Sequence, residues 1–160
     1  MKDYQMDLNW VGEQCRADAP AQLVLQRIMT GLHARNPDYH WIGIYFLNGN
    51  ELNLGPYAGP VTDHVRIPVG RGVCGTAVAE NRDQVVDDVI TLNNYLACNL
   101  ETKSEMVALI RNSNGTIKAQ LDVDGKKIAL FDLPEQSYIR RVAALLAPLI
   151  ERSLRESTAT

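Results

Sequence analysis

The chain has 160 residues and a formal net charge of −3, so it is long enough for one domain with a core that needs no disulfide bonds. Its basic residues are scattered and no apolar run approaches the roughly 20 residues of a membrane span, which argues against nucleic-acid binding and membrane insertion. Because the amino-terminal residues lack the apolar segment of a secretory signal and the three cysteines are an odd number, we expect a single cytoplasmic domain over residues 1–160, with free thiols.

Helical periodicity marks two segments, one near each end of the chain. Pro20 stands in the first turn of a first helix predicted over residues 18–35, and Asp132 with Pro134 opens a closing helix over residues 132–156. Apolar residues recur at helical spacing in both segments, so one face of each helix is expected to be buried. These apolar positions are Leu23, Val24, Ile28, Met29 and Leu32, and then Ile139, Val142, Leu145, Leu146 and Leu149.

Two hairpins and two shorter strands are predicted between these helices, from β-favouring residues bounded by turn residues. The hairpins turn at residues 48–50 and 112–115, and a short helix is predicted at 76–80. The predicted strands cover residues 40–47, 51–57, 65–67, 84–86, 105–110 and 117–123. This order is typical of an α+β fold with the terminal helices on one face of an antiparallel sheet. The other face is then free for a pocket roofed by segments 58–75 and 87–103, because loops of that length are usually functional.

Two of the three cysteines lie in glycine-rich or polar segments rather than within apolar runs. Cys74 is in the glycine turn 70–77 at a predicted helix start, and Cys98 is in a polar loop. Buried structural cysteines behave as small hydrophobic residues, so these two positions indicate thiol chemistry, although the turn around Cys74 could simply need a small side chain. Cys15 precedes the first predicted helix and is expected to have no role.

Three glycines of that turn also spell the GxGxxG pattern of dinucleotide sites, namely Gly70, Gly72 and Gly75. Pro68 interrupts the preceding strand, and the flanking strands have the pattern of hairpins rather than of a parallel βαβ unit, which disfavours a dinucleotide site. Glycines that permit a positive φ in a turn are a simpler interpretation. A third interpretation fits better: the turn brings backbone N–H groups and Cys74 close to a ligand at a helix N-terminus.

An ordered set of motifs between residues 37 and 124 makes the chain resemble a known family. The motifs are HWIGIY at 40–45, ELNLGPY at 51–57, VRIP at 65–68, GRGVCGTA at 70–77, AC at 97–98, KSE at 103–105 and LDVD at 121–124. The chain resembles the free methionine-(R)-sulfoxide reductases, which are built on a GAF domain. The resemblance implies thiol-dependent reduction of free L-methionine-(R)-sulfoxide to methionine.

The resemblance implies roles for two cysteines and also shows departures from the family pattern. Cys98 matches the nucleophile of the family's Ala-Cys-Asp motif, and Cys74 matches a second cysteine that lines the pocket. Many members carry a further, resolving cysteine ten residues before the one matched by Cys74, and this chain has His64 there. The aspartate that normally follows the nucleophile is Asn99. We expect an active reductase with altered recycling.

Acidic and aromatic residues complete the site that the resemblance implies. Glu105, Asp122 and Asp124 match acidic groups that hold the substrate, while Trp41 and Tyr45 match aromatic residues that enclose its methyl-sulfoxide end. The chemistry needs such groups, because the sulfoxide oxygen must be protonated and a buried carboxylic acid can donate that proton, a catalytic role for Glu105. Clustered carboxylates would also neutralise the ammonium of a free amino acid. Without a pocket, the two aspartates would be solvated and the two aromatic side chains would be core.

Recycling of the enzyme is implied to use thiols alone. The first step leaves a sulfenic acid on cysteine, which another thiol converts to a disulfide. An external, thioredoxin-like dithiol would then restore the enzyme, and a homodimer is usual for the family. No bound cofactor is expected. His33, His40 and His64 lack metal-ligand spacing, so no metal is expected either.

A second function class stays open at this point. GAF domains also bind small ligands without catalysis, and this chain could be a degenerate reductase or a sensor. Turnover of free methionine-(R)-sulfoxide with a dithiol would indicate the enzyme, whereas binding without turnover would indicate the non-catalytic module.

Overall fold

The computed structural model describes residues 1–93, 95 and 101–159 of the chain. Its helices are α1 (Tyr4–Cys15), α2 (Ala21–Arg35), α3 (Gly72–Glu80), the 3-10 turn η1 (Val89–Thr91) and α4 (Leu133–Thr158). Its strands are β1 (Tyr39–Asn48), β2 (Glu51–Ala58), β3 (Arg66–Pro68), β4 (Gln84–Val86), β5 (Ser104–Arg111) and β6 (Ile117–Gly125). Among the described helices, none combines the length and apolar character needed to cross a membrane.

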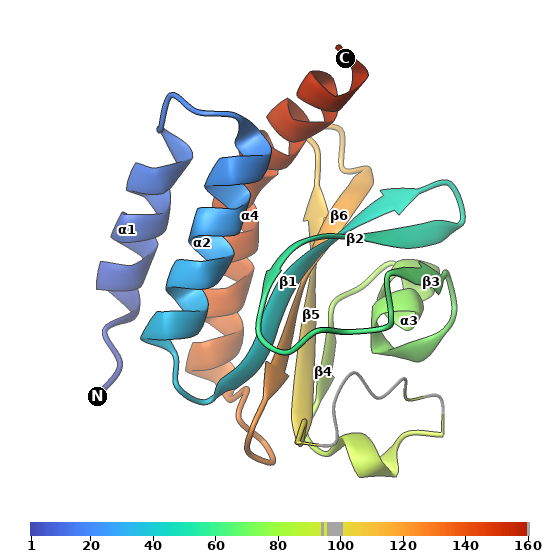
Figure 1. Cartoon of the computed structure of the whole chain (residues 1–160). Helices are drawn as coiled ribbons and strands as arrows, with labels where there is room; N and C mark the ends of the chain where they lie inside the picture. Colours follow the sequence, from blue (N-terminus) through green and yellow to red (C-terminus); the bar gives the residue numbers. More distant parts are fainter. Residues whose placement is uncertain (94, 96–100, 160) are drawn as a thin grey trace.

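The strands form one sheet in the order β3-β2-β1-β6-β5-β4, and every neighbouring pair is antiparallel. Helices α1, α2 and α4 lie together on one side of this sheet, whereas α3 lies on the other side (Figure 1). The structure confirms the predicted α+β arrangement. Its two hairpins, β1–β2 and β5–β6, meet through β1 and β6 at the centre of the sheet.

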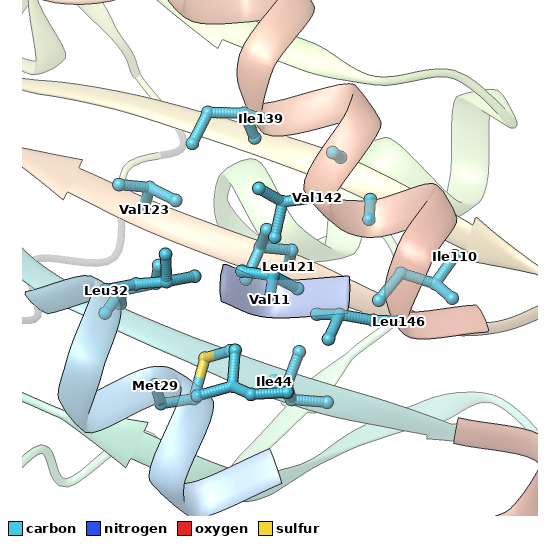
Figure 2. Packing of buried hydrophobic residues seen from close by; sticks show 14 of the residues in the cluster. Val11, Met29, Leu32, Ile44, Ile110, Leu121, Val123, Ile139, Val142 and Leu146 are labelled. Atoms are coloured by element: carbon cyan, nitrogen blue, oxygen red, sulfur yellow. The ribbon is translucent and has the colours of Figure 1, made fainter. Parts of the chain in front are cut away.

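The main hydrophobic core lies between the sheet and the three long helices. Alternate residues of a strand point to the same face. The buried residues of β1, β5 and β6 that face the helices therefore recur at every second position, as Ile44, Ile110, Leu121 and Val123 do in Figure 2. Their partners come from α1, α2 and α4, and include Val11, Met29, Leu32, Ile139, Val142 and Leu146. This packing covers one face of the sheet and leaves the other face for α3 and the loops.

Two local predictions differ from the structure at the beginnings of helices. Helix α1 precedes the predicted first helix, and its apolar stripe is narrow, with Leu8 and Val11 as the only buried apolar residues among the twelve of the helix. Cys15 is thus the last residue of a helix rather than part of a segment before one. Helix α3 begins at Gly72 instead of residue 76. Gly70 and Gly72 have φ of 94° and 63°, which confirms the turn-glycine interpretation.

The partly buried ammonium of Lys2 ties the amino-terminal residues to α4. The Lys2 ammonium forms an ion pair with Glu135 and donates to the Tyr39 hydroxyl at 3.1 Å. It also lies 4.1 to 4.9 Å from the ring centroids of Tyr4, Tyr39 and Tyr138. The negative faces of aromatic rings attract an ammonium, and this cation–π attraction is stronger when the ammonium is partly desolvated.

We expect the substitution Lys2→Ala to lower the free energy of unfolding by about 1–3 kcal/mol, because the buried Glu135 carboxylate would lose its cation. Chemical denaturation measures this loss. Lys127→Ala is the matched control: the Lys127–Asp38 pair is largely exposed, and such pairs contribute about 1 kcal/mol or less. Equal losses for the two variants would contradict a stabilising role of the Lys2 group.

Candidate functional site

The sheet face away from the three long helices gathers the acidic and aromatic residues singled out in the sequence. The strand register pairs Trp41 with Asp124, and Asp124 with Glu105, so these residues form one row across β1, β6 and β5. Asp122 is two residues before Asp124 and pairs with Gly43 of β1 in the next row. Because residues two apart on a strand share a face, both aspartates point to the side that carries α3.

Helix α3 brings a thiol to this acidic row. The Cys74 Sγ atom lies 4.0 Å from Oε1 of Glu105. One donor atom each from Cys74, Glu105 and Asp122 lie within 4.8 Å of one another, an arrangement that could hold a metal ion. The three side chains also line a cavity of about 10 Å³ together with residues 67 and 71–73. The structure thus brings together three of the predicted site residues, from α3, β5 and β6.

The carboxylates of this site are buried almost completely, with exposed fractions of 4% for Glu105, 0% for Asp122 and 1% for Asp124. Within the described part of the chain, no oxygen of either aspartate has a hydrogen-bond partner of normal geometry. Buried polar groups usually have such partners, so these two side chains are suited to a ligand that supplies them.

Burial also shifts the acidity of these groups. It raises the pKa of Glu105 well above the usual range, and the charges of Asp122 and Asp124 raise it further. The pKa of Asp124 is raised well above its usual range by burial and by the charge of Asp122, against the opposing effect of Thr102. Burial raises the pKa of Asp122 as well, although Glu105 and Cys74 favour its charged form. A carboxyl group with a raised pKa can keep a proton and donate it to a developing anion.

The aromatic side of the site is a stack of three rings. The Trp41 ring lies between Tyr45, at 6.0 Å between ring centroids, and Tyr57, at 5.3 Å, with interplanar angles of 29° and 18°. The Tyr45 hydroxyl donates to the backbone carbonyl of His64 at 2.8 Å, which ties the loop before β3 to β1. Tyr57 was not predicted as a site residue. A shift of the strand register between Gly43 and Tyr45 places Tyr57 opposite Gly43, next to the Trp41 ring, and the regular hairpin predicted from the sequence does not contain this shift.

Gly43 leaves the space in which the Trp41 ring lies. A Cβ atom at this position would be 2.3 Å from Cη2 of Trp41 and 2.7 Å from Cβ of Tyr57. We therefore expect Gly43→Ala to displace the Trp41 ring and to lower the free energy of unfolding by about 1–3 kcal/mol. Near-ultraviolet circular dichroism and chemical denaturation measure the two effects.

Gly12→Ala provides the matched control. Gly12 lies within α1, and a Cβ atom there would meet only Arg16 Nη1, at 4.0 Å. Alanine is favoured over glycine inside helices, so this variant should gain about 0.5–1 kcal/mol. A Gly43→Ala protein with unchanged stability and an unchanged near-ultraviolet spectrum would show that the ring does not need this space.

A buried glutamine on β6 is a further residue that the sequence analysis did not single out. Gln120 is 0% exposed, and neither of its side-chain amide atoms has a hydrogen-bond partner in the described part of the chain. It pairs with Tyr45, so it forms the next polar position of the same face after Asp122. The sequence could have indicated Gln120, because it lies two residues before Asp122 on the same predicted strand and such residues share a face.

Cys98, the predicted nucleophile, lies outside the described residues, as does Asn99. Contacts with the rest of the fold hold the described residues on both sides of this segment. Leu92 and Tyr95 pack against the cluster that contains Trp41 and Cys74. On the other side, the backbone of Lys103 bonds with Val89 and with Gly125, at 3.0 and 2.8 Å.

No protein-family model matches the chain. A protein of Escherichia coli named free methionine-R-sulfoxide reductase is 38% identical over 119 residues, which cover 74% of this chain and 71% of that protein. The solved structure of the free methionine-R-sulfoxide reductase of Neisseria meningitidis, in complex with its substrate, superposes with a TM-score of 0.87 at 30% identity and covers 96% of this chain and 91% of that chain.

A structure described as the GAF domain superposes with a TM-score of 0.83 at 27% identity, over 91% of this chain and 85% of that chain. These likenesses confirm the GAF fold that the resemblance implied.

Proposed function

The chain belongs to the free methionine-R-sulfoxide reductase family, and we propose that it reduces free L-methionine-(R)-sulfoxide to methionine with electrons from thiols. The observation that carries this proposal is the buried acidic group of Glu105, Asp122 and Asp124, which faces Cys74 on one side and the Trp41 stack on the other.

Recognition of the free amino acid follows from the two aspartates. Burying a carboxylate without a partner is unfavourable, and a ligand ammonium would supply both a charge and hydrogen-bond donors. A methionine within a peptide has no ammonium next to its side chain. We propose that Asp122 and Asp124 select the free amino acid in this way, while Trp41 and Tyr45 enclose the apolar methyl-sulfoxide end.

The proposed chemistry transfers the sulfoxide oxygen to a cysteine. The Cys98 thiolate attacks the sulfoxide sulfur, and Glu105 donates a proton to the oxygen. The S–O bond of the substrate breaks, the oxygen bonds to the Cys98 sulfur, and the transient bond between the two sulfur atoms breaks as methionine leaves. Cys98 is then a sulfenic acid, so the cysteine is oxidised as the substrate is reduced. A second thiol attacks the sulfenic acid, forms a disulfide and releases water. An external dithiol of the thioredoxin type then reduces the disulfide.

Cys74 is the internal thiol that we propose for the second step, because His64 stands where a resolving cysteine is usual. The 4.0 Å distance from its Sγ atom to Oε1 of Glu105 supports this role. The proposed disulfide also requires the Cα atoms of the two cysteines to lie within about 7 Å of each other. Substrate added without a reductant should therefore give an intramolecular Cys74–Cys98 disulfide, detected by mass spectrometry of the digested protein. A sulfenic acid that persists on Cys98 and reacts with dimedone would mean that the external thiol resolves it directly.

The proposed function is tested with the full chain, free L-methionine-(R)-sulfoxide and dithiothreitol, by quantifying methionine chromatographically. We expect methionine to form catalytically, at many equivalents per protein. Saturable binding of the sulfoxide without formation of methionine would contradict the proposal and favour the non-catalytic binding module.

A further inference from the structure

One thiol and two carboxylates converge at a single point beneath α3. Cys74 comes from α3, Glu105 from β5 and Asp122 from β6, and one donor atom of each lies within 4.8 Å of the other two. All three residues are buried, with exposed fractions of 4%, 4% and 0%. These three donors have no metal-ligand spacing in the sequence, because only the fold brings them together.

Two further observations suggest that this point suits a cation. Both oxygens of Asp122 are buried and have no hydrogen-bond partner of normal geometry within the described residues, although Cys74 and Glu105 lie beside them. The three side chains also line one shared cavity of about 10 Å³, which is near the space that a single water-sized sphere occupies. A cation there would supply the partner that the buried carboxylate lacks.

The donor set identifies the class of cation. A thiolate is a soft ligand that favours zinc over magnesium or calcium, and carboxylates complete common zinc sites. Tetrahedral zinc with Zn–S of about 2.3 Å and Zn–O of about 2.0–2.2 Å holds its donor atoms about 3.5 Å apart. The Cys74 Sγ to Glu105 Oε1 distance is 4.0 Å, so small side-chain movements would bring these two atoms to that spacing.

We propose that Cys74, Glu105 and Asp122 bind one zinc ion as three protein ligands, and that bound zinc excludes the sulfoxide substrate. Binding releases the thiol proton, and any carboxyl proton, to solvent and changes no oxidation state, because zinc is redox-inert. The exclusion of substrate rests on the proposed function, since zinc would occupy carboxylates that the substrate needs. The metal binding itself does not depend on that function.

The binding is tested with Co²⁺ as a spectroscopic probe of the same site. Chelator-treated, phosphine-reduced protein is titrated anaerobically with Co²⁺. We expect one equivalent to produce a thiolate-to-cobalt charge-transfer band in the near ultraviolet and the strong visible bands of tetrahedral cobalt. Added Zn²⁺ should remove both, because zinc binds such sites more tightly than cobalt. Absence of the charge-transfer band in the wild-type protein would overturn the proposal.

Four variants assign the ligands. Cys74→Ser should lose the charge-transfer band, and Asp122→Asn should weaken cobalt binding at least tenfold, whereas Cys15→Ser and Cys98→Ser should keep the band. A band that survives Cys74→Ser, or that disappears in Cys98→Ser, would overturn the assignment. Far-ultraviolet circular dichroism checks folding. If Asp122→Asn is unfolded, Glu105→Gln takes its place, with the same tenfold loss expected.

Inhibition of sulfoxide reduction by zinc is measured in a separate experiment. If the protein reduces the sulfoxide, zinc should inhibit competitively, with an inhibition constant equal to its dissociation constant, and a chelator should restore activity. Zinc that binds without inhibiting would overturn the exclusion of substrate. A protein that shows no turnover at all would contradict the proposed function, while the cobalt titration would still test the metal site.

Discussion

Replacing Cys98 by serine is expected to abolish reduction of free methionine-(R)-sulfoxide, with a loss of at least about a thousandfold in kcat, because a serine hydroxyl is a far weaker nucleophile at neutral pH. The free energy of unfolding should stay within about 0.5 kcal/mol of the wild-type value if the substitution disturbs no part of the core. Methionine formation and calorimetry measure the two effects. Cys15→Ser, in α1 and across the sheet from the acidic residues, is the matched control and should keep full activity. Substantial turnover by the Cys98→Ser protein would transfer the nucleophile's role to Cys74.

Replacing Glu105 by glutamine should lower kcat by about 10²–10⁴-fold, since loss of a general acid typically costs this much. The side chain keeps its shape, and a neutral amide is less costly to bury than a carboxylate, so stability should not fall. The combination of lost activity and retained stability distinguishes a chemical role from a structural one.

The exposed Glu51 of β2 provides the control for this substitution. Glu51 is 42% exposed in its side chain and pairs with Arg66 at 3.9 Å. Glu51→Gln should keep kcat within about twofold of the wild-type value and the free energy of unfolding within about 0.5 kcal/mol of it. If the Glu105→Gln protein keeps more than a tenth of the wild-type kcat, the proton comes from another group.

Local patterns in the sequence predicted most of the secondary structure. The hairpins followed from alternating β-favouring residues around turns, and helices α2 and α4 followed from broad apolar stripes. Helix α1 could not be recognised in the same way, because its buried face has only Leu8 and Val11 as apolar residues.

The candidate site could be predicted only in part, because its parts meet through long-range pairing. That Asp122 and Asp124 share a face follows from their spacing alone. The predicted hairpin of residues 105–110 and 117–123 brings them near Glu105, whereas their position next to Trp41 depends on the pairing of β6 with β1, which no local pattern specifies. The approach of Cys74 depends in addition on how α3 packs over that face.

The most direct test of the account compares free methionine-(R)-sulfoxide with its N-acetylated form, because the buried carboxylates are proposed to bind the ammonium. Losing one partner of a buried charge pair costs about 2–5 kcal/mol, so kcat/KM for the acetylated compound should fall at least about 30-fold. The (S) epimer should also fail, since the proton donor lies on one side of the sulfur. Equal kcat/KM values for the free and acetylated (R)-sulfoxides would contradict the proposed role of Asp122 and Asp124.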